Sequence, residues 1–196
     1  LLSRVIQDLV QVLEECLAKP LEAVHLTFTP ISMQKLLSNS TNSNSNFSLI
    51  NRINSNTQSG LLGVNIGPNK DTEDRLNDYL IGLKTFYDIA DYITINISSP
   101  NTKNLRDFHE EKKLDELMSS IEKEKINLKS KIPIVVKISP DIMDDQINLI
   151  SEILLKYKVS AIIISNTTEG GRENLRNILK HQKGGLSGKP IEEKSN

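Results

Sequence analysis

The fold of this chain is decided by Tyr92–Ile93–Thr94–Ile95, a short apolar run that ends in the polar cluster Asn96–Ile97–Ser98–Ser99. Three further apolar runs end in the same way, at Asn65, at Lys137 and at Ser165–Asn166–Thr167. Stretches with helical periodicity separate the runs, and this alternation is typical of repeated βα units. Because the carboxyl ends of parallel strands share one face, we expect these polar side chains to form one site there.

The spacing of apolar residues predicts which segments form strands and which form helices. An amphipathic helix is expected over residues 4–17, ahead of the βα units, and a Ser/Asn-rich linker over residues 38–46. The strand candidates cover Leu21–Phe28 and residues 61–65, 91–97, 132–138 and 159–165, and the helix candidates cover residues 72–88, 109–125 and 142–157.

Each predicted helix has an apolar face that we expect to pack inward. The first helix is expected to take Asp71 or Thr72 as its N-cap, and strand 159–165 is expected to be buried on both faces. The inward residues are expected to be Leu76, Leu80, Leu83 and Tyr87 on the first helix, Leu114, Leu117, Met118 and Ile121 on the second, and Ile147, Ile150, Leu154 and Tyr157 on the third.

Composition excludes several classes of function. The chain has 196 residues, and 24 Lys and Arg against 25 Asp and Glu give a net charge of −1. Such a balance provides no electrostatic attraction to nucleic acid or to an anionic membrane. The single cysteine, Cys16, cannot form an internal disulfide. Residues 1–18 fit neither a signal nor a transit peptide, and no apolar run is long enough for a spanning helix.

Three asparagines, Asn65, Asn96 and Asn166, stand at matching places at strand ends. Each amide offers both a donor and an acceptor, which suits the alternating polar groups of a pyrimidine or flavin ring. Lys137 ends a third strand and has two readings, a lysine with a buried stem and a solvated head or a cation held beside an electron-rich ring or an anion.

Two loops are further candidates. Pro100 stiffens Ser98–Ser99–Pro100–Asn101–Thr102, which can hold a hydroxyl close to a substrate proton, although such residues are also ordinary in a βα turn. Gly184–Gly185–Leu186–Ser187–Gly188 can form a backbone nest for a phosphate. The three histidines, His25, His109 and His181, are too scattered to predict a metal site.

Five motifs, in this order and at these spacings, make the chain similar to the class 2 branch of the dihydroorotate dehydrogenases, the quinone-linked, membrane-associated enzymes of mitochondria and some bacteria. The similarity runs from about Leu49 to Pro190. The motifs are Gly63–Lys70, Ala90–Thr102 followed by Leu105–Arg106, Val136–Asp141, Ser165–Thr168 and Gly184–Pro190.

The resemblance implies an α/β fold of the (β/α)8 TIM-barrel type, an FMN cofactor, and oxidation of dihydroorotate to orotate in de novo pyrimidine (UMP) synthesis with ubiquinone as electron acceptor. It implies that Ser99, where class 1 enzymes use cysteine, is the base that takes the C5 proton. The implied FMN-binding residues are Asn65, Asn96, Lys137, Ser165 and Gly188, and the implied substrate-binding residues are Asn51, Asn96, Asn101, Thr102, Asn166 and Thr167.

The chain also departs from the family pattern, and two alternatives stay open. Four βα units do not close a barrel, so we expect an incomplete one, with residues 1–48 a divergent N-terminal helix and linker, 49–190 the FMN-binding part and 191–196 a tail. Residues 1–48 lack the family's early active-site lysine. One alternative is a truncated or misspliced fragment without flavin, and the other is a related flavin barrel acting on another pyrimidine. By resemblance, the expected location is the mitochondrial inner membrane, contacted through the full-length N-terminal region.

Overall fold

The fold was analysed in a computed structural model. It describes the backbone of residues 24–28 and residues 61–69, 72–99, 105–173, 175–176, 178–182 and 184–195. The expected helix over residues 4–17 and the Ser/Asn-rich linker lie outside the described residues. So do three of the expected substrate-binding residues, Asn51, Asn101 and Thr102.

Five parallel strands form one sheet, and their order in the sheet is their order in the chain. The four predicted strands are therefore confirmed, and a long helix follows each of the first three, whereas β5 is followed in the described residues by short elements only. The upstream strand candidate adds a fifth strand that pairs with the first of them. The strands are β1 (Val24–Phe28), β2 (Leu62–Ile66), β3 (Tyr92–Asn96), β4 (Ile134–Lys137) and β5 (Ala161–Ile163).

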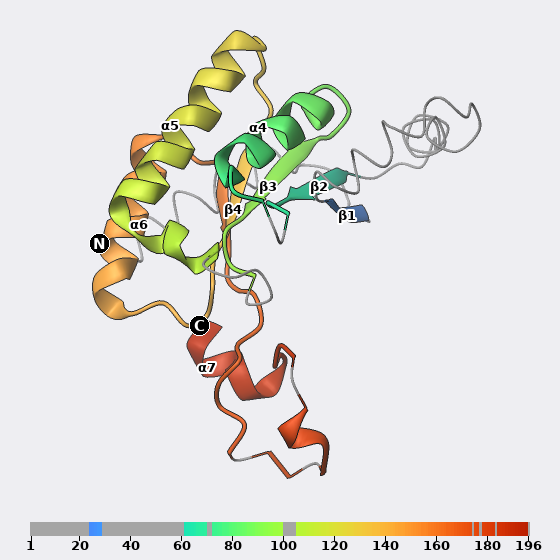
Figure 1. The fold of residues 1–196 in the computed structure, drawn as a ribbon, viewed down its shortest axis with the longest axis vertical. Coiled ribbons are helices and arrows are strands. Elements are labelled where there is room, and N and C mark those ends of the chain that lie inside the picture. Colours follow the sequence, from blue (N-terminus) through green and yellow to red (C-terminus); the bar gives the residue numbers. More distant parts are fainter. Residues whose placement is uncertain are drawn as a thin grey trace, which may run out of the picture.

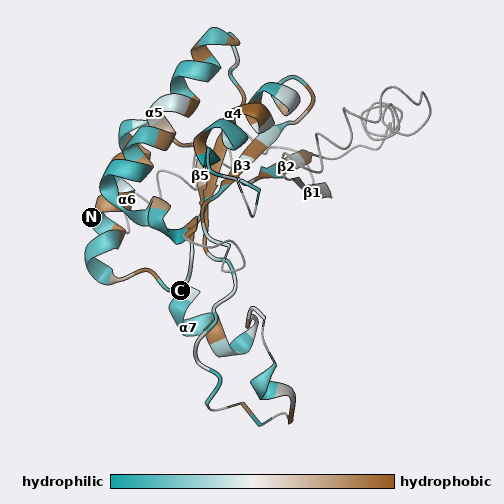
Figure 2. Ribbon diagram, in the orientation of Figure 1, coloured by the Kyte–Doolittle hydropathy of each residue, from teal (hydrophilic) through white to brown (hydrophobic). Residues whose placement is uncertain are grey.

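Three long helices lie together on one face of this sheet (Figure 1), and α5 packs between α4 and α6. They are α4 (Arg75–Phe86), α5 (Glu111–Asn127) and α6 (Asp144–Lys156). Figure 2 shows hydrophobic and hydrophilic residues mixed along each of these helices, and most of their buried residues are hydrophobic and belong to the core. Shorter elements complete the described part: η2 (Leu105–His109), η3 (Ile178–His181), η4 (Lys189–Ile191) and α7 (Glu192–Ser195). None of the helices in the described part is both long enough and apolar enough to cross a membrane.

The start of α4 differs from the expectation. Its N-cap is Asp74, whose Oδ1 accepts a 3.0 Å hydrogen bond from the backbone N–H of Asn77, so the prediction of Asp71 or Thr72 is wrong. The helix begins three residues later than expected because a capping side chain must reach the exposed N–H groups of the first turn.

The buried face of α4 is also rotated from the expected one. Tyr79, Leu83 and Phe86 are buried, whereas Leu76, Leu80 and Tyr87 are only partly so. The hydroxyl of Tyr79 donates a 2.7 Å hydrogen bond to the backbone carbonyl of Asn96, which satisfies this polar atom inside the core and fixes the rotation of the helix.

The buried face of α5 is confirmed at all four predicted positions, and that of α6 at two. In α6, Ile153 is buried, whereas Ile147 and Tyr157 are partly exposed. Strand β5 is shorter than predicted and is not buried on both faces, since Ile164 directly after it is 48% exposed. Within the described sheet β5 is an edge strand, and the helices cover one face only, so nothing described covers its other face.

Side chains alternate between the two faces of the sheet. The helix-facing core includes Val64, Ile66, Ile93, Ile95, Ile134 and Val136. Asn65, Thr94, Asn96 and Lys137 occupy the intervening positions, so they lie on the opposite face. In a closed barrel of this type that face is the interior, where the strand ends carry the site.

Candidate functional site

The register of the strands places the expected site residues side by side. Asn96 pairs with Lys137 across β3 and β4, and Lys137 pairs with Ile163 across β4 and β5. Paired residues point to the same face, so the amide of Asn96 and the ammonium of Lys137 stand next to each other at the carboxyl edge. Asn65 lies one row deeper, paired with Thr94, and is 4% exposed.

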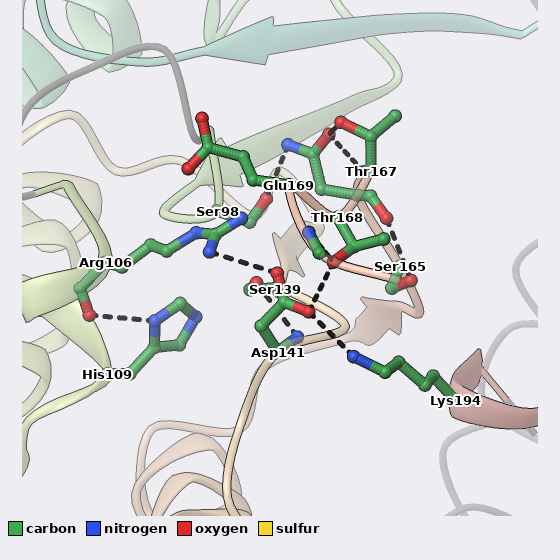
Figure 3. Close-up of polar contacts among 12 residues, drawn as sticks. Ser98, Arg106, His109, Ser139, Asp141, Ser165, Thr167, Thr168, Glu169 and Lys194 are labelled. Carbon is green, nitrogen blue, oxygen red and sulfur yellow. Dashed lines mark hydrogen bonds and ion pairs between the residues drawn. The ribbon is translucent and has the colours of Figure 1, made fainter. Parts of the chain in front are cut away.

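A serine joins the two neighbouring asparagines of the site. The Oγ of Ser98 donates a 2.8 Å hydrogen bond to Oδ1 of Asn96, and it accepts one of 3.0 Å from Nδ2 of Asn166. Figure 3 shows this bond between the segment after β5 and the segment after β3. Ser98 had no individual role in the sequence-based prediction, because its neighbour Ser99 matched the family's base.

The segment after β5 is ordered by its own side chains. The Oδ1 of Asn166 accepts a 2.7 Å hydrogen bond from the backbone N–H of Thr167. The Oγ of Ser165 donates to the carbonyl of Asn166 at 3.0 Å and lies 3.0 Å from the Oγ of Ser195 in α7. Ser165, Asn166 and Thr167 therefore hold a defined arrangement at the end of β5.

An open pocket of about 690 Å³ lies at the ends of β4 and β5. It brings together five of the residues singled out from the sequence, namely Lys137, Ser165, Asn166, Thr167 and Gly188. Its other described lining residues are Ser187, Lys189, Ile191, Glu192 and Ser195. Asn65, Asn96 and Ser99 are not among the described lining residues; Ser99 is half-buried in the segment that leaves β3.

Gly188 has a backbone that favours glycine. Its φ is 71° and its ψ is −150°, a backbone conformation that residues other than glycine rarely adopt. Its two chain neighbours aside, no atom of the described residues lies within 4 Å of the position that a Cβ would occupy. The loop therefore presents its backbone to the pocket without a side chain in the way, as a loop that contacts a ligand through its N–H groups must.

A carboxylate below the pocket connects four segments (Figure 3). Asp141, in the loop after β4, pairs with Arg106 of η2 at 3.1 Å and with Lys194 of α7 at 3.1 Å. It also accepts a 2.6 Å hydrogen bond from the hydroxyl of Thr168. Burial alone would raise the pKa of the Asp141 carboxyl, but the bonds from Thr168 and Lys194 and the charge of Arg106 hold that pKa below its ordinary value.

These four residues, Arg106, Asp141, Thr168 and Lys194, form what we call the Asp141 cluster, which was not predicted from the sequence. The available signal was the presence of Arg106, Asp141 and Thr168 within the matched motifs. Beside it, the buried His109 donates from Nδ1 to the carbonyl of Arg106 at 2.9 Å. Burial lowers the pKa of His109, and the charge of Arg106 lowers it further against the opposing effect of this hydrogen bond.

Comparison with known proteins gives the family. The model of the dihydroorotate dehydrogenase family matches residues 32–195. The "Dihydroorotate dehydrogenase (quinone)" of Acinetobacter baylyi is 45% identical over 143 residues, which are 69% of this chain and 42% of that protein. The protein of the same name from Bartonella tribocorum is 43% identical over 143 residues, 70% of this chain and 39% of that protein.

Solved structures agree with the sequence comparison. The ligand-free DHODH of Eimeria tenella has a TM-score of 0.69 and 32% identity over 74% of this chain and 46% of that one. The complex of that enzyme with ferulenol has a TM-score of 0.66 and 34% identity over 71% of this chain and 42% of that one. The chain thus spans less than half the length of these proteins, and its fold is that of the βα units of the TIM barrel they form. Because the family model covers most of its residues, the chain belongs to the dihydroorotate dehydrogenase family.

Proposed function

We propose that this chain carries the flavin- and substrate-binding face of a quinone-linked dihydroorotate dehydrogenase, which oxidises dihydroorotate to orotate in pyrimidine biosynthesis. The observation that carries the proposal is the pocket at the ends of β4 and β5. It gathers five residues, from three separate segments, that the family resemblance assigns to FMN or to orotate. The names of the relatives support a quinone as the electron acceptor.

The residues present fit FMN by the chemistry of their polar groups. The pocket is lined by two lysines, Lys137 and Lys189, and it offers the hydroxyls of Ser165 and Thr167 and the amide of Asn166. Such a set suits a planar ring whose edge alternates donors and acceptors. Gly188 also lines the pocket, and its backbone is open there to hold a phosphate if FMN binds. When bound, FMN supplies the acceptor for the hydride that leaves C6 of dihydroorotate.

In this proposal Lys137, Asn96 and Asn166 bind and orient the flavin and the substrate. Lys137 pairs with Asn96 at the carboxyl edge of the sheet, where its positive charge would stabilise negative charge on a bound flavin ring. Asn96 and Asn166 contact the substrate from opposite sides of β4, and Asn65 extends the same polar face one row deeper. Ser165 orients the segment that carries Asn166.

Ser99 takes the C5 proton of dihydroorotate. It follows directly on Ser98, which is buried and hydrogen-bonded to two strand ends, so the base projects from a fixed point. A hydroxyl is a weak base, and the proton therefore has to pass onward from Ser99. The family resemblance assigns Asn101 and Thr102 to substrate binding, and the proposed path of the proton runs through Thr102 and water.

Ubiquinone is the proposed acceptor, reached at a membrane surface through the N-terminal region of the full-length protein. The resemblance to the membrane-associated branch supports this assignment. The mitochondrial inner membrane is the proposed location for a chain from a eukaryote. The two relatives named above as "Dihydroorotate dehydrogenase (quinone)" are bacterial.

The test is FMN binding by the full chain and by a variant of the pocket. The chain is titrated into FMN while flavin fluorescence is followed, and the same is done for Lys137→Ala. We expect saturable binding that weakens about tenfold or more in the variant, because a charged partner of the ring is removed. Lys131→Ala, at an exposed lysine ahead of β4, is the matched control and should bind like the parent chain. No binding by the parent chain, or equal binding by Lys137→Ala, contradicts the proposal.

A further inference from the structure

Ser98 is a buried polar residue that the proposed function uses only as the fixed neighbour of Ser99. It is 0% exposed, and it precedes the proposed base by one residue. Its backbone N–H donates to Oδ1 of Asn96 at 3.2 Å, and its hydroxyl donates to the same oxygen at 2.8 Å. The hydroxyl also accepts from Nδ2 of Asn166 at 3.0 Å. One serine thus contacts both asparagines.

The direction of these hydrogen bonds is fixed by the backbone. A backbone N–H can only donate, so the end of the Asn96 amide that faces the N–H of Ser98 must be its oxygen. In the same way the N–H of Thr167 requires the oxygen of Asn166, which leaves the NH₂ of Asn166 facing Ser98. The hydroxyl of Ser98 therefore has a single arrangement, as donor to Asn96 and acceptor from Asn166.

This arrangement decides what Asn96 offers to a ligand. With Oδ1 held by Ser98, the NH₂ of Asn96 is the end left for other partners, and no described residue accepts from it. Asn96 stands in the same row as Lys137, so this edge presents donors to the ligand. The complementary groups on a ligand are the carbonyl or carboxylate oxygens of a planar ring acid.

The same hydroxyl connects strand ends that are not neighbours. β4 lies between β3 and β5 in the sheet, so no backbone ladder joins the two outer strands. The bond from Asn166 to Ser98 spans 68 residues of sequence and ties the two ends together across β4. A shift of either end would then move both amides.

We propose that Ser98 is a positioning residue that sets Asn96 as a hydrogen-bond donor toward the ligand and holds Asn166 in register with it. The proposal rests on the proposed function, in which Asn96 and Asn166 contact the substrate. Ser98 itself contacts no ligand. Its loss affects the orientation of two amides, whereas a purely structural serine would affect stability alone.

The experiment compares Ser98→Ala with Ser139→Ala. Ser139 is 3% exposed, follows the neighbouring strand β4, and its Oγ accepts a hydrogen bond from the backbone N–H of Asp141. The two variants therefore remove the same group from equally buried strand ends. Ser98→Cys is added as a variant that keeps the volume but hydrogen-bonds weakly.

Two readouts separate this inference from the proposed function. The first is the exchange rate of the side-chain NH₂ protons of Asn166, followed by NMR in the chain without ligands. We expect exchange to speed up in Ser98→Ala and Ser98→Cys and to stay unchanged in Ser139→Ala. The second is orotate affinity of the FMN-loaded chain, which we expect to fall about tenfold or more in both Ser98 variants and less than about twofold in Ser139→Ala.

Each outcome either supports or overturns the positioning role of Ser98. Faster exchange with weaker orotate binding, both confined to the Ser98 variants, supports positioning. Unchanged exchange in Ser98→Ala, or equal loss of affinity in Ser98→Ala and Ser139→Ala, overturns it. If the parent chain binds no FMN, the proposed function fails for this chain, and the exchange readout alone then decides whether Ser98 holds Asn166.

Discussion

The hydroxyl of Thr168 donates a 2.6 Å hydrogen bond to Oδ1 of Asp141, which joins the segment after β5 to the loop after β4. The same carboxylate pairs with Arg106 from η2 and with Lys194 from α7. These contacts lie beside the residues that line the pocket, so the Asp141 cluster determines how the ends of the strands are held together. Its members come from four segments, and removing the charge of Asp141 tests all of them at once.

We expect Asp141→Asn to lower the free energy of unfolding by about 1–2 kcal/mol, because the amide can still accept from Thr168 but loses the two ion pairs. Asp88→Asn, at an exposed turn residue, should change it by less than about 0.5 kcal/mol. The measurement is urea unfolding at neutral pH. Equal stability of the Asp141 variant and the parent chain would show that the cluster contributes nothing to holding the strand ends.

Because His109 is buried, we expect the free energy of unfolding to depend on pH. Its pKa is lowered in the folded chain, so the unfolded chain binds the proton more tightly. The contribution of neutral His109 to the free energy of unfolding is therefore fully present above the unfolded pKa of about 6.5. It is lost as the pH falls through the lower pKa of the folded chain. The physical cause is burial, since Nε2 of His109 has no hydrogen-bond partner among the described residues.

The check is unfolding by urea at a series of pH values from about 7.5 to about 5, which spans the unfolded pKa. We expect His109→Phe to flatten the decline, and His181→Phe, at an exposed histidine, to leave it as in the parent chain. A decline of the same slope in His109→Phe would assign the pH dependence to other groups.

Gly188 provides a test of the loop at the pocket. Its φ of 71° with a ψ of −150° makes Gly188→Ala strained although the space for a methyl group is open. We expect the backbone strain in Gly188→Ala to cost about 1–3 kcal/mol. The loop should rearrange to relieve it, and FMN should bind more weakly in a fluorescence titration. Gly170→Ala, with an ordinary contact 3.7 Å from its added Cβ, is the control. Identical FMN affinities of the two variants would exclude the loop from the binding site.

Sequence alone predicted the part of the fold that follows from periodicity. The order of strands and helices and the buried face of α5 are read from spacing within one element. The rotation of α4 could not be read that way, since it depends on a hydrogen bond from Tyr79 to a carbonyl on another element. The exposure of Ile164 at the end of β5 could not be predicted in this way either, because it depends on which other elements cover that strand.

The candidate site was predicted where residues from successive strand ends meet, and the structure places Lys137, Ser165, Asn166 and Thr167 around one pocket. The Asp141 cluster and the link from Ser98 to Asn166 were missed. Both depend on partners many residues apart, and the chemistry of an isolated Ser, Arg or Asp does not reveal them. The roles of all the candidate site residues toward FMN and substrate stay predictions, including those of the residues that line the pocket.

The most direct test of the proposed function is the visible absorption spectrum of the FMN-loaded chain before and after anaerobic addition of dihydroorotate. We expect a bound-flavin spectrum that bleaches with dihydroorotate, and loss of that bleaching in Ser99→Ala while the flavin stays bound. A spectrum identical to that of free FMN, or bound flavin that dihydroorotate leaves unchanged, would contradict it.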